Sequence, residues 1–71
     1  MMPNEGGNFV FQVITIVGTS PESWEKATAS AVETASKKVQ VVGVKVEEFD
    51  THVENGKVLL YGVKLKVTIK F

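Results

Sequence analysis

The chain has 71 residues, no cysteine, and eight basic against eight acidic side chains, so its formal net charge is zero. This length allows one domain at most, and the lack of cysteine excludes disulfides and thiolate metal sites. A balanced charge argues against a general electrostatic attraction to nucleic acid or to an anionic membrane. No run of the sequence is long and apolar enough to span a bilayer.

The first eight residues are polar and rich in glycine, without the apolar core of a signal peptide. We interpret residues 1–8 as a flexible N-terminal arm and residues 9–71 as the domain of a cytoplasmic protein. Residues 9–17 predict the first strand, because almost every side chain there is β-branched or aromatic. Val13 and Val17 fall on one face and Ile14 on the other, so we expect both faces of this strand to be covered.

A corner between strand and helix follows the first strand. Ser20 stands where an N-cap is expected, and Pro21 suits the first helical position. We therefore expect a helix from Pro21 to about Lys38, with Glu22 and Glu25 near the positive end of its dipole.

The predicted helix has one apolar face at helical spacing. Its members are Trp24, Ala27, Ala31, Val32 and Ala35. The alanines allow the helix to lie close to a sheet. We expect Trp24 to anchor the core near the helix start rather than to stack on a ligand.

Two further strands are predicted over residues 41–51 and 57–71, joined at Asn55-Gly56. This dipeptide between two β runs is typical of a type I′ turn, in which both residues take positive φ. A two-residue loop fixes the register and pairs Glu54 with Lys57. The same register sets Val46 opposite Leu65, Val44 opposite Val67 and Val42 opposite Ile69 on one face, and Glu47 opposite Lys64, Lys45 opposite Lys66, Gly43 opposite Thr68 and Phe49 opposite Gly62 on the other.

These elements predict an α+β fold, β-α-β-β, with a three-stranded antiparallel sheet partly wrapped around one helix. We place the third strand in the centre; the alternative sets the first strand parallel to the second. One helix covers one face only, which leaves Phe49, Val58 and Leu60 uncovered on the other. We therefore expect an obligate homo-oligomer.

Three segments carry a family resemblance: residues 13–25 with the Gly18-Thr19-Ser20-x-x-Ser23 corner, residues 31–37, and residues 52–58 across the hairpin. Together they resemble the dodecins, over nearly the whole chain from about Phe11. Dodecins are small β-α-β-β proteins, generally hollow shells of twelve copies that bind flavins. The resemblance implies a homododecameric shell that binds or stores a small ligand, which in this family is a flavin (riboflavin, FMN or FAD).

Dodecins typically carry a tryptophan in the second strand that stacks on the flavin, and a glutamine after a third-strand tyrosine that hydrogen-bonds the ring. By resemblance these positions fall on Gly43 and on Gly62, which follows Tyr61. The flavin-pocket positions are thus Gly43, Val44, Lys45 and Gly62, without the two contact side chains. We expect both glycines on the sheet face away from the helix. They either enlarge a pocket for another ligand or let strands approach so closely that no pocket remains.

Dodecin shells also hold cations near subunit axes, at acidic residues that match Glu22 and Glu48. Carboxylate oxygens suit Ca²⁺ or Mg²⁺. The alternative functions are therefore a calcium- or cation-binding shell without flavin, and a scaffold without a ligand; for the carboxylates themselves, the alternative is ordinary solvated charge.

His52, the sole histidine, is expected to be a polar residue near a strand end. No arrangement meets the minimum for a catalytic site, so we expect no enzyme. The expected partners are copies of this chain and a small molecule, with neither nucleic acid nor membrane.

Overall fold

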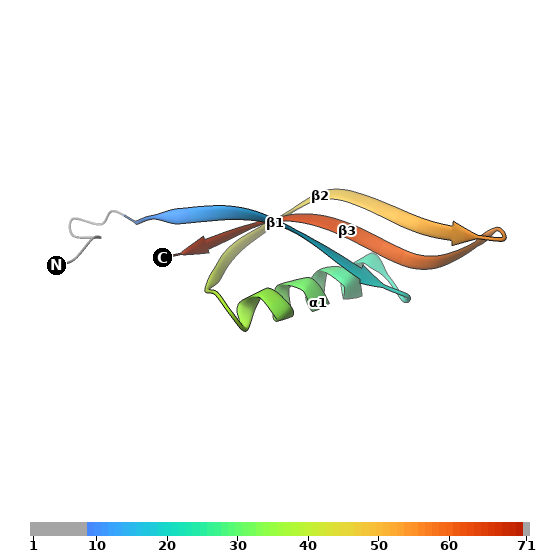
Figure 1. The fold of residues 1–71 in the computed structure, drawn as a ribbon, viewed down its shortest axis with the longest axis horizontal. Coiled ribbons are helices and arrows are strands. Elements are labelled where there is room, and N and C mark those ends of the chain that lie inside the picture. The colour runs from blue at the N-terminus through green and yellow to red at the C-terminus, as the bar shows by residue number, and fades with distance from the viewer. Residues whose placement is uncertain (1–8, 71) are drawn as a thin grey trace.

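The computed structural model describes residues 9–70 and has the order strand, helix, strand, strand. The elements are β1 (Phe11–Ser20), α1 (Trp24–Ser36), β2 (Val41–Glu54) and β3 (Lys57–Lys70) (Figure 1). The predicted arm over residues 1–8 and the predicted last strand residue, Phe71, lie outside the described residues.

The sheet has the order β1-β3-β2, and β3 is antiparallel to both neighbours. The α+β class and the central position of the third strand are confirmed, and the parallel alternative is excluded. In Figure 1, α1 lies along one face of the sheet, and the hairpin between β2 and β3 extends beyond the helix. The end of this hairpin beyond Tyr61, where the pairing of β3 with β1 stops, is therefore a two-stranded ribbon without a helix over it; we call it the distal hairpin.

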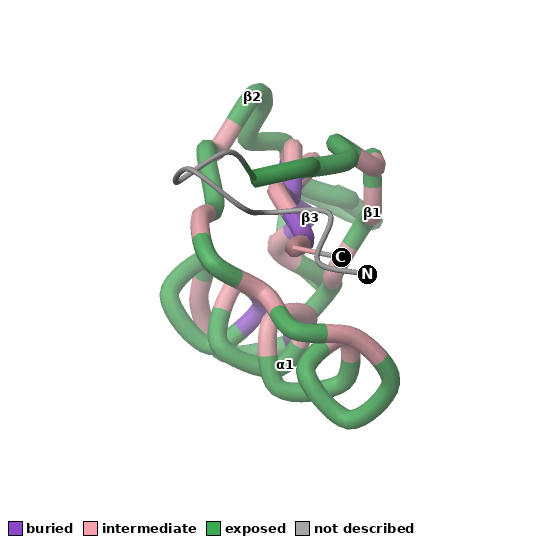
Figure 2. Tube along the Cα trace, turned by 90° about the vertical axis from the view of Figure 1, so that its left-hand side faces the viewer, coloured by how far each residue is buried: buried purple, intermediate pink, exposed green. Residues whose placement is uncertain are grey.

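The core lies between α1 and the central strand. Its buried members are Ala27 from the helix and Val63, Leu65, Val67 and Ile69 from β3. Figure 2 shows this burial as purple segments on β3 and on α1. Because strand side chains alternate, Lys64, Lys66 and Thr68 project from the other side of β3. We call the sheet face toward α1 the inner face and the opposite one the outer face.

Only the inner side of β1 is covered within one chain. Ile14 and Ile16 pack against the core, whereas Val17 on the outer face is 69% exposed. The expectation that both faces of this strand are covered is therefore met on one face by the chain itself and stays a prediction for the other. A stripe of β-branched side chains, including Val13, remains in contact with solvent.

Gly18 is the point of closest approach between β1 and α1. A Cβ atom at this position would lie 2.6 Å from the carbonyl oxygen of Ala27 and 2.8 Å from the Cβ atom of Ala31. Both distances are too short for a real side chain. The hydrogen of glycine and the small alanines therefore allow the helix to lie directly on the strand.

The helix begins three residues later than predicted. Its N-cap is Ser23, whose hydroxyl accepts a 3.0 Å hydrogen bond from the backbone N–H of Lys26. Ser20 is instead the last residue of β1, and its hydroxyl accepts from the N–H of Glu22 at 3.0 Å. The prediction of Ser20 as N-cap was wrong because β1 continues three residues beyond Val17.

The remaining element ends differ by small amounts from the prediction. β1 begins at Phe11 rather than at residue 9, and α1 ends at Ser36 with Lys37 as its C-cap, rather than at about Lys38. β2 continues to Glu54 instead of stopping at residue 51, because pairing with β3 runs up to the turn.

The turn between β2 and β3 has the predicted chemistry. Asn55 and Gly56 have φ values of 53° and 76°, as a type I′ turn requires. The predicted pairing of Glu54 with Lys57 is confirmed, and so is the pairing of residues 43–46 with residues 65–68. Val46 is the last residue of this second stretch that keeps the predicted register.

Between these two stretches the register is shifted by one residue. Leu59 on β3 and Glu47 on β2 have no partner in the ladder, so each is an extra residue and the second shift cancels the first. A third irregularity skips Val42. The predicted pairs Glu47–Lys64, Phe49–Gly62 and Val42–Ile69 are therefore wrong: Glu48 faces Lys64, Phe49 faces Val63, Asp50 faces Gly62 and Val41 faces Ile69.

Candidate functional site

The predicted flavin-pocket residues are divided between the two faces of the sheet. Gly43 lies opposite Thr68 and Lys45 opposite Lys66, which places both on the outer face. Val44 lies opposite the buried Val67 and so belongs to the inner face. The outer face at Gly43 is open, because a Cβ atom there would meet only the Thr68 side chain, at 3.8 Å.

Gly62 also lies on the outer face, as expected, but far from Gly43. Its ladder neighbours are Thr19 on β1 and Asp50 on β2. Gly43 faces Thr68, six positions further along β3, which corresponds to about 20 Å at the usual rise of a strand. One chain therefore does not bring Gly43 and Gly62 into a single pocket, and a small ring that touches both positions has to lie between two copies.

The space beside Gly62 is taken by the side chain of Asp50. A Cβ atom at Gly62 would collide with the Oδ1 atom of Asp50 and would lie 3.2 Å from its Cγ atom. The two residues are direct partners in the ladder. A carboxylate therefore lies against the bare backbone of the central strand at this point of the outer face.

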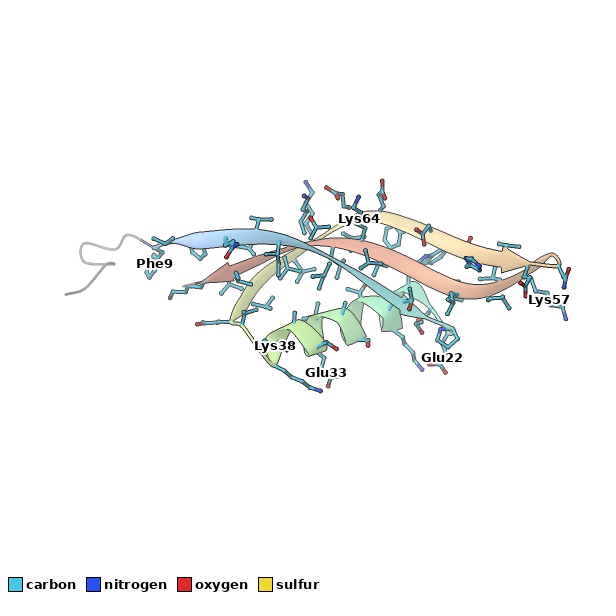
Figure 3. The ribbon with its side chains drawn as sticks, in the orientation of Figure 1. Phe9, Glu22, Glu33, Lys38, Lys57 and Lys64 are labelled. Atoms are coloured by element: carbon cyan, nitrogen blue, oxygen red, sulfur yellow. The ribbon has the colours of Figure 1, made fainter. Side chains whose placement is uncertain are left out.

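A small cluster of charged side chains lies in the middle of the outer face, where Val17 and Glu48 are the ladder neighbours of Lys64. The carboxylate of Glu47 lies 4.0 Å from the Nζ atoms of both Lys64 and Lys66. In Figure 3, the labelled Lys64 projects from the sheet on the side away from α1. These ion pairs are long and partly exposed, so each contributes little to stability.

The two predicted metal ligands do not form a metal site within one chain. Glu22 precedes α1 (Figure 3), and its carboxylate pairs with Lys26 at 2.7 Å, with 63% of the Glu22 side chain exposed. Glu48 is on β2 opposite Lys64. Within residues 9–70, no three or more histidine, cysteine, aspartate or glutamate side chains lie close enough to hold a metal ion.

An aromatic cluster joins the start of α1 to the sheet. The indole Nε1 of Trp24 donates a 2.9 Å hydrogen bond to the carbonyl oxygen of Asp50. The Trp24 ring meets Tyr61 and Phe49 edge-on, at centroid distances of 5.0 and 5.7 Å. Trp24 is 37% exposed and is absent from the buried core, so its prediction as a core anchor was wrong.

Sequence reasoning missed this cluster because it placed Phe49 on the outer face. The unpaired Glu47 reverses the alternation of β2 and turns Phe49 to the inner face, beside Trp24. Nothing in the sequence marks Glu47 as an extra residue. The contact between Trp24 and Phe49 could therefore be predicted only if the bulge at Glu47 had been known.

Two hollows flank the helix. One, of about 380 Å³, has an almost wholly apolar lining from Trp24, Glu25, Thr28, Ala29, Val46 and Phe49. The other, of about 350 Å³, lies between β1 and α1 and is lined by Ile16, Val17, Gly18, Thr19, Ser30, Ala31, Thr34 and Ala35. Neither hollow contains a predicted site residue.

His52 occupies an exposed position on β2 opposite Leu60, near the end of the strand as expected. In the part of the chain that the structure describes, no helix is long and apolar enough to cross a membrane.

Comparison with known proteins gives one consistent result. The family model described as Dodecin matches residues 10–71. A curated relative, the calcium dodecin of Mycobacterium tuberculosis, is 44% identical over 62 residues, which are 86% of this chain and 87% of that protein.

Solved structures agree with this result. Dodecin from Streptomyces davaonensis superimposes with a TM-score of 0.86 at 28% identity, over 90% of this chain and 96% of the other. The crystal structure of the calcium-chelating antigen calcium dodecin from Mycobacterium tuberculosis, described as having a novel calcium-binding site, gives a TM-score of 0.79 at 44% identity, over 87% and 90%. The fold, the matched family model and the 44% identical relative together show that this chain belongs to the dodecin family.

Proposed function

We propose that the protein is a non-catalytic, homododecameric shell that binds a divalent cation, with Ca²⁺ as the first ion to test. The observation that carries this proposal is the 44% identity to a calcium dodecin over 86% of the chain. Both positions at which the resemblance expects flavin contacts are glycines, Gly43 and Gly62. We therefore propose a cation as the ligand ahead of the flavin that the family resemblance implies.

The distribution of apolar side chains supports self-assembly. In residues 9–70, five hydrophobic residues are buried, whereas thirteen large ones are exposed. Exposed apolar area on this scale usually marks an interface. Copies of the chain would cover the outer side of β1, the two hollows beside α1 and the distal hairpin.

In the proposed shell the cation site would be built by several copies, because residues 9–70 of one chain form no metal-binding group. Ca²⁺ takes six to eight oxygen ligands, and a symmetry axis can bring together copies of one carboxylate. Glu22 and Glu48 are the carboxylates that the family resemblance assigns to this task. The exposure of Glu22 is compatible with a ligand shared between copies.

The test is a thermal melt of the purified protein with Ca²⁺, with Mg²⁺ and with a chelator. A ligand at about 100 times its dissociation constant stabilises by about 2.7 kcal/mol, so a bound ion raises Tm by several degrees. We expect Glu22→Gln and Glu48→Gln to reduce this rise. Glu33→Gln, which removes an exposed carboxylate from α1, is the matched control and should retain it. Identical melting curves in all three solutions would exclude a cation-binding function.

A flavin remains the second candidate ligand, because the outer face at Gly43 is open. Titration of riboflavin, FMN and FAD with detection of flavin fluorescence tests it. Saturable quenching at micromolar concentrations would support a flavin-binding shell. If neither flavins quench nor cations raise Tm, the remaining function is a scaffold without a small ligand.

A further inference from the structure

Asp50 is the polar side chain that lies closest to the bare backbone of Gly62. The two residues are paired in the ladder, and the carboxylate fills the direction in which a Cβ atom of residue 62 would point. On the other side of Gly62, β1 presents Thr19. Thr19, Gly62 and Asp50 thus form one row across the three strands, which we call the Gly62 row. A ligand that reaches the central strand at this row of the outer face meets the carboxylate of Asp50 first.

The main chain of Asp50 is held in place from the inner side. The indole Nε1 of Trp24 donates to its carbonyl oxygen at 2.9 Å, and the next residue back, Phe49, packs against the same indole. The carboxylate can rotate about its side-chain bonds, but its anchor on β2 is fixed. The negative charge thus stays within one side-chain length of Gly62.

The chemistry of a carboxylate decides what this row can accept. An ionised carboxylate is an acceptor only, whereas an amide both donates and accepts. The polar edge of a flavin carries two carbonyl oxygens on either side of one N–H group. A carboxylate can accept from the N–H group, but it offers no donor to the two carbonyl oxygens. Facing Asp50, the carbonyl oxygens of such a ring lose their water without gaining a hydrogen bond.

We propose that Asp50 determines the ligand class of the outer face at Gly62: its carboxylate favours cations and ligands whose polar edge only donates hydrogen bonds, and disfavours rings whose polar edge is mainly carbonyl oxygens. This inference rests on the proposed ligand-binding function. It assigns the discrimination between cation and flavin to Asp50, which faces Gly62 where the sequence analysis had predicted Phe49. Asp50 is here a specificity-determining residue with no catalytic role.

The test compares the wild-type protein with Asp50→Asn, which keeps the volume of the side chain, adds a donor and removes the charge. The Trp24 hydrogen bond goes to the main chain and so is retained in this variant. The matched control is Glu54→Gln, the same change at the end of β2, opposite Lys57. Riboflavin is the probe because it carries no phosphate, and its fluorescence reports binding.

We expect Asp50→Asn to bind riboflavin about tenfold more tightly than the wild-type protein, and Glu54→Gln to match the wild type. Equal affinity of Asp50→Asn and the wild type, or no saturable quenching by Asp50→Asn, would overturn the inference. A gain in Glu54→Gln equal to that in Asp50→Asn would also overturn it, since net charge alone would then explain the effect.

A Ca²⁺ melt of the same proteins separates this inference from the proposed function. Stabilisation of the wild type by Ca²⁺ without any riboflavin gain in Asp50→Asn leaves the cation function standing and removes the role of Asp50. A riboflavin gain in Asp50→Asn without any effect of Ca²⁺ on the wild type supports the role of Asp50 and removes the cation function.

Discussion

The indole of Trp24 donates a 2.9 Å hydrogen bond to the carbonyl oxygen of Asp50, which ties the first residue of α1 to a strand 26 positions away. The bond crosses from helix to sheet next to the point where β2 leaves its simple alternation. It connects the helix start, the bulge at Glu47 and the row that contains Gly62.

Trp24→Phe removes this hydrogen bond and keeps an aromatic ring. We expect a loss of about 1 kcal/mol in the free energy of unfolding, the usual net value of one hydrogen bond. Urea unfolding at a fixed protein concentration measures it, because the stability of an assembled protein depends on concentration. Tyr61→Phe, in which the ring next to Trp24 is retained, is the control and should change stability by less than about 0.5 kcal/mol.

Gly18→Ala places a Cβ atom against the backbone of α1, which cannot move without shifting the helix. We expect a loss of about 2 kcal/mol, seen as a decrease in Tm of about 10 °C. Gly62→Ala meets only the mobile end of the Asp50 side chain and should lower Tm by a few degrees at most. Similar melting temperatures for the two variants would contradict the close approach of helix and strand at Gly18.

Ser23→Ala removes the N-cap of α1, and we expect it to cost about 1 kcal/mol. Amide hydrogen exchange locates the effect: the N–H of Lys26 should exchange faster in Ser23→Ala and at its normal rate in Ser20→Ala. Ser20→Ala should instead release the N–H of Glu22. Faster exchange of the Lys26 N–H in Ser20→Ala would contradict Ser23 as the N-cap and would favour a helix that begins after Ser20.

The exposed distal hairpin offers a test of assembly. We expect the wild-type protein to sediment at low micromolar concentration as a particle near twelve times 7.7 kDa. Val58→Asp with Leu60→Asp puts two charges among exposed apolar side chains and should lower that mass. Lys57→Asp, with the same new charge beside the turn, should not. A folded wild-type monomer would rule out the shell.

Turn chemistry and alternation predicted much of this fold correctly. Asn55-Gly56 specified the hairpin, and the apolar run of β3 indicated a central strand. The helix start was misplaced because Ser20 and Ser23 are both competent N-caps, and only the length of β1 decides between them.

The site was less accessible to prediction, for two physical reasons. A single extra residue reverses every side chain beyond it, so Glu47 exchanged the faces of Phe49 and Asp50 without any local signal. Beyond this, Gly43 and Gly62 are about 20 Å apart along β3, and Glu22 and Glu48 complete no ion site within the described residues of one chain. The pattern of one chain contains no information about which residues of neighbouring copies would lie beside these positions.

The one-sided core has an evolutionary consequence. Stability comes from the inner face, where Val63, Leu65 and Val67 meet α1, while the outer positions of the same strand take no part in that packing. Substitutions on the outer face therefore leave the packing of the core within one chain unchanged. Members of one family can therefore differ at outer-face positions such as Gly43 and Gly62 while the fold of the chain stays the same.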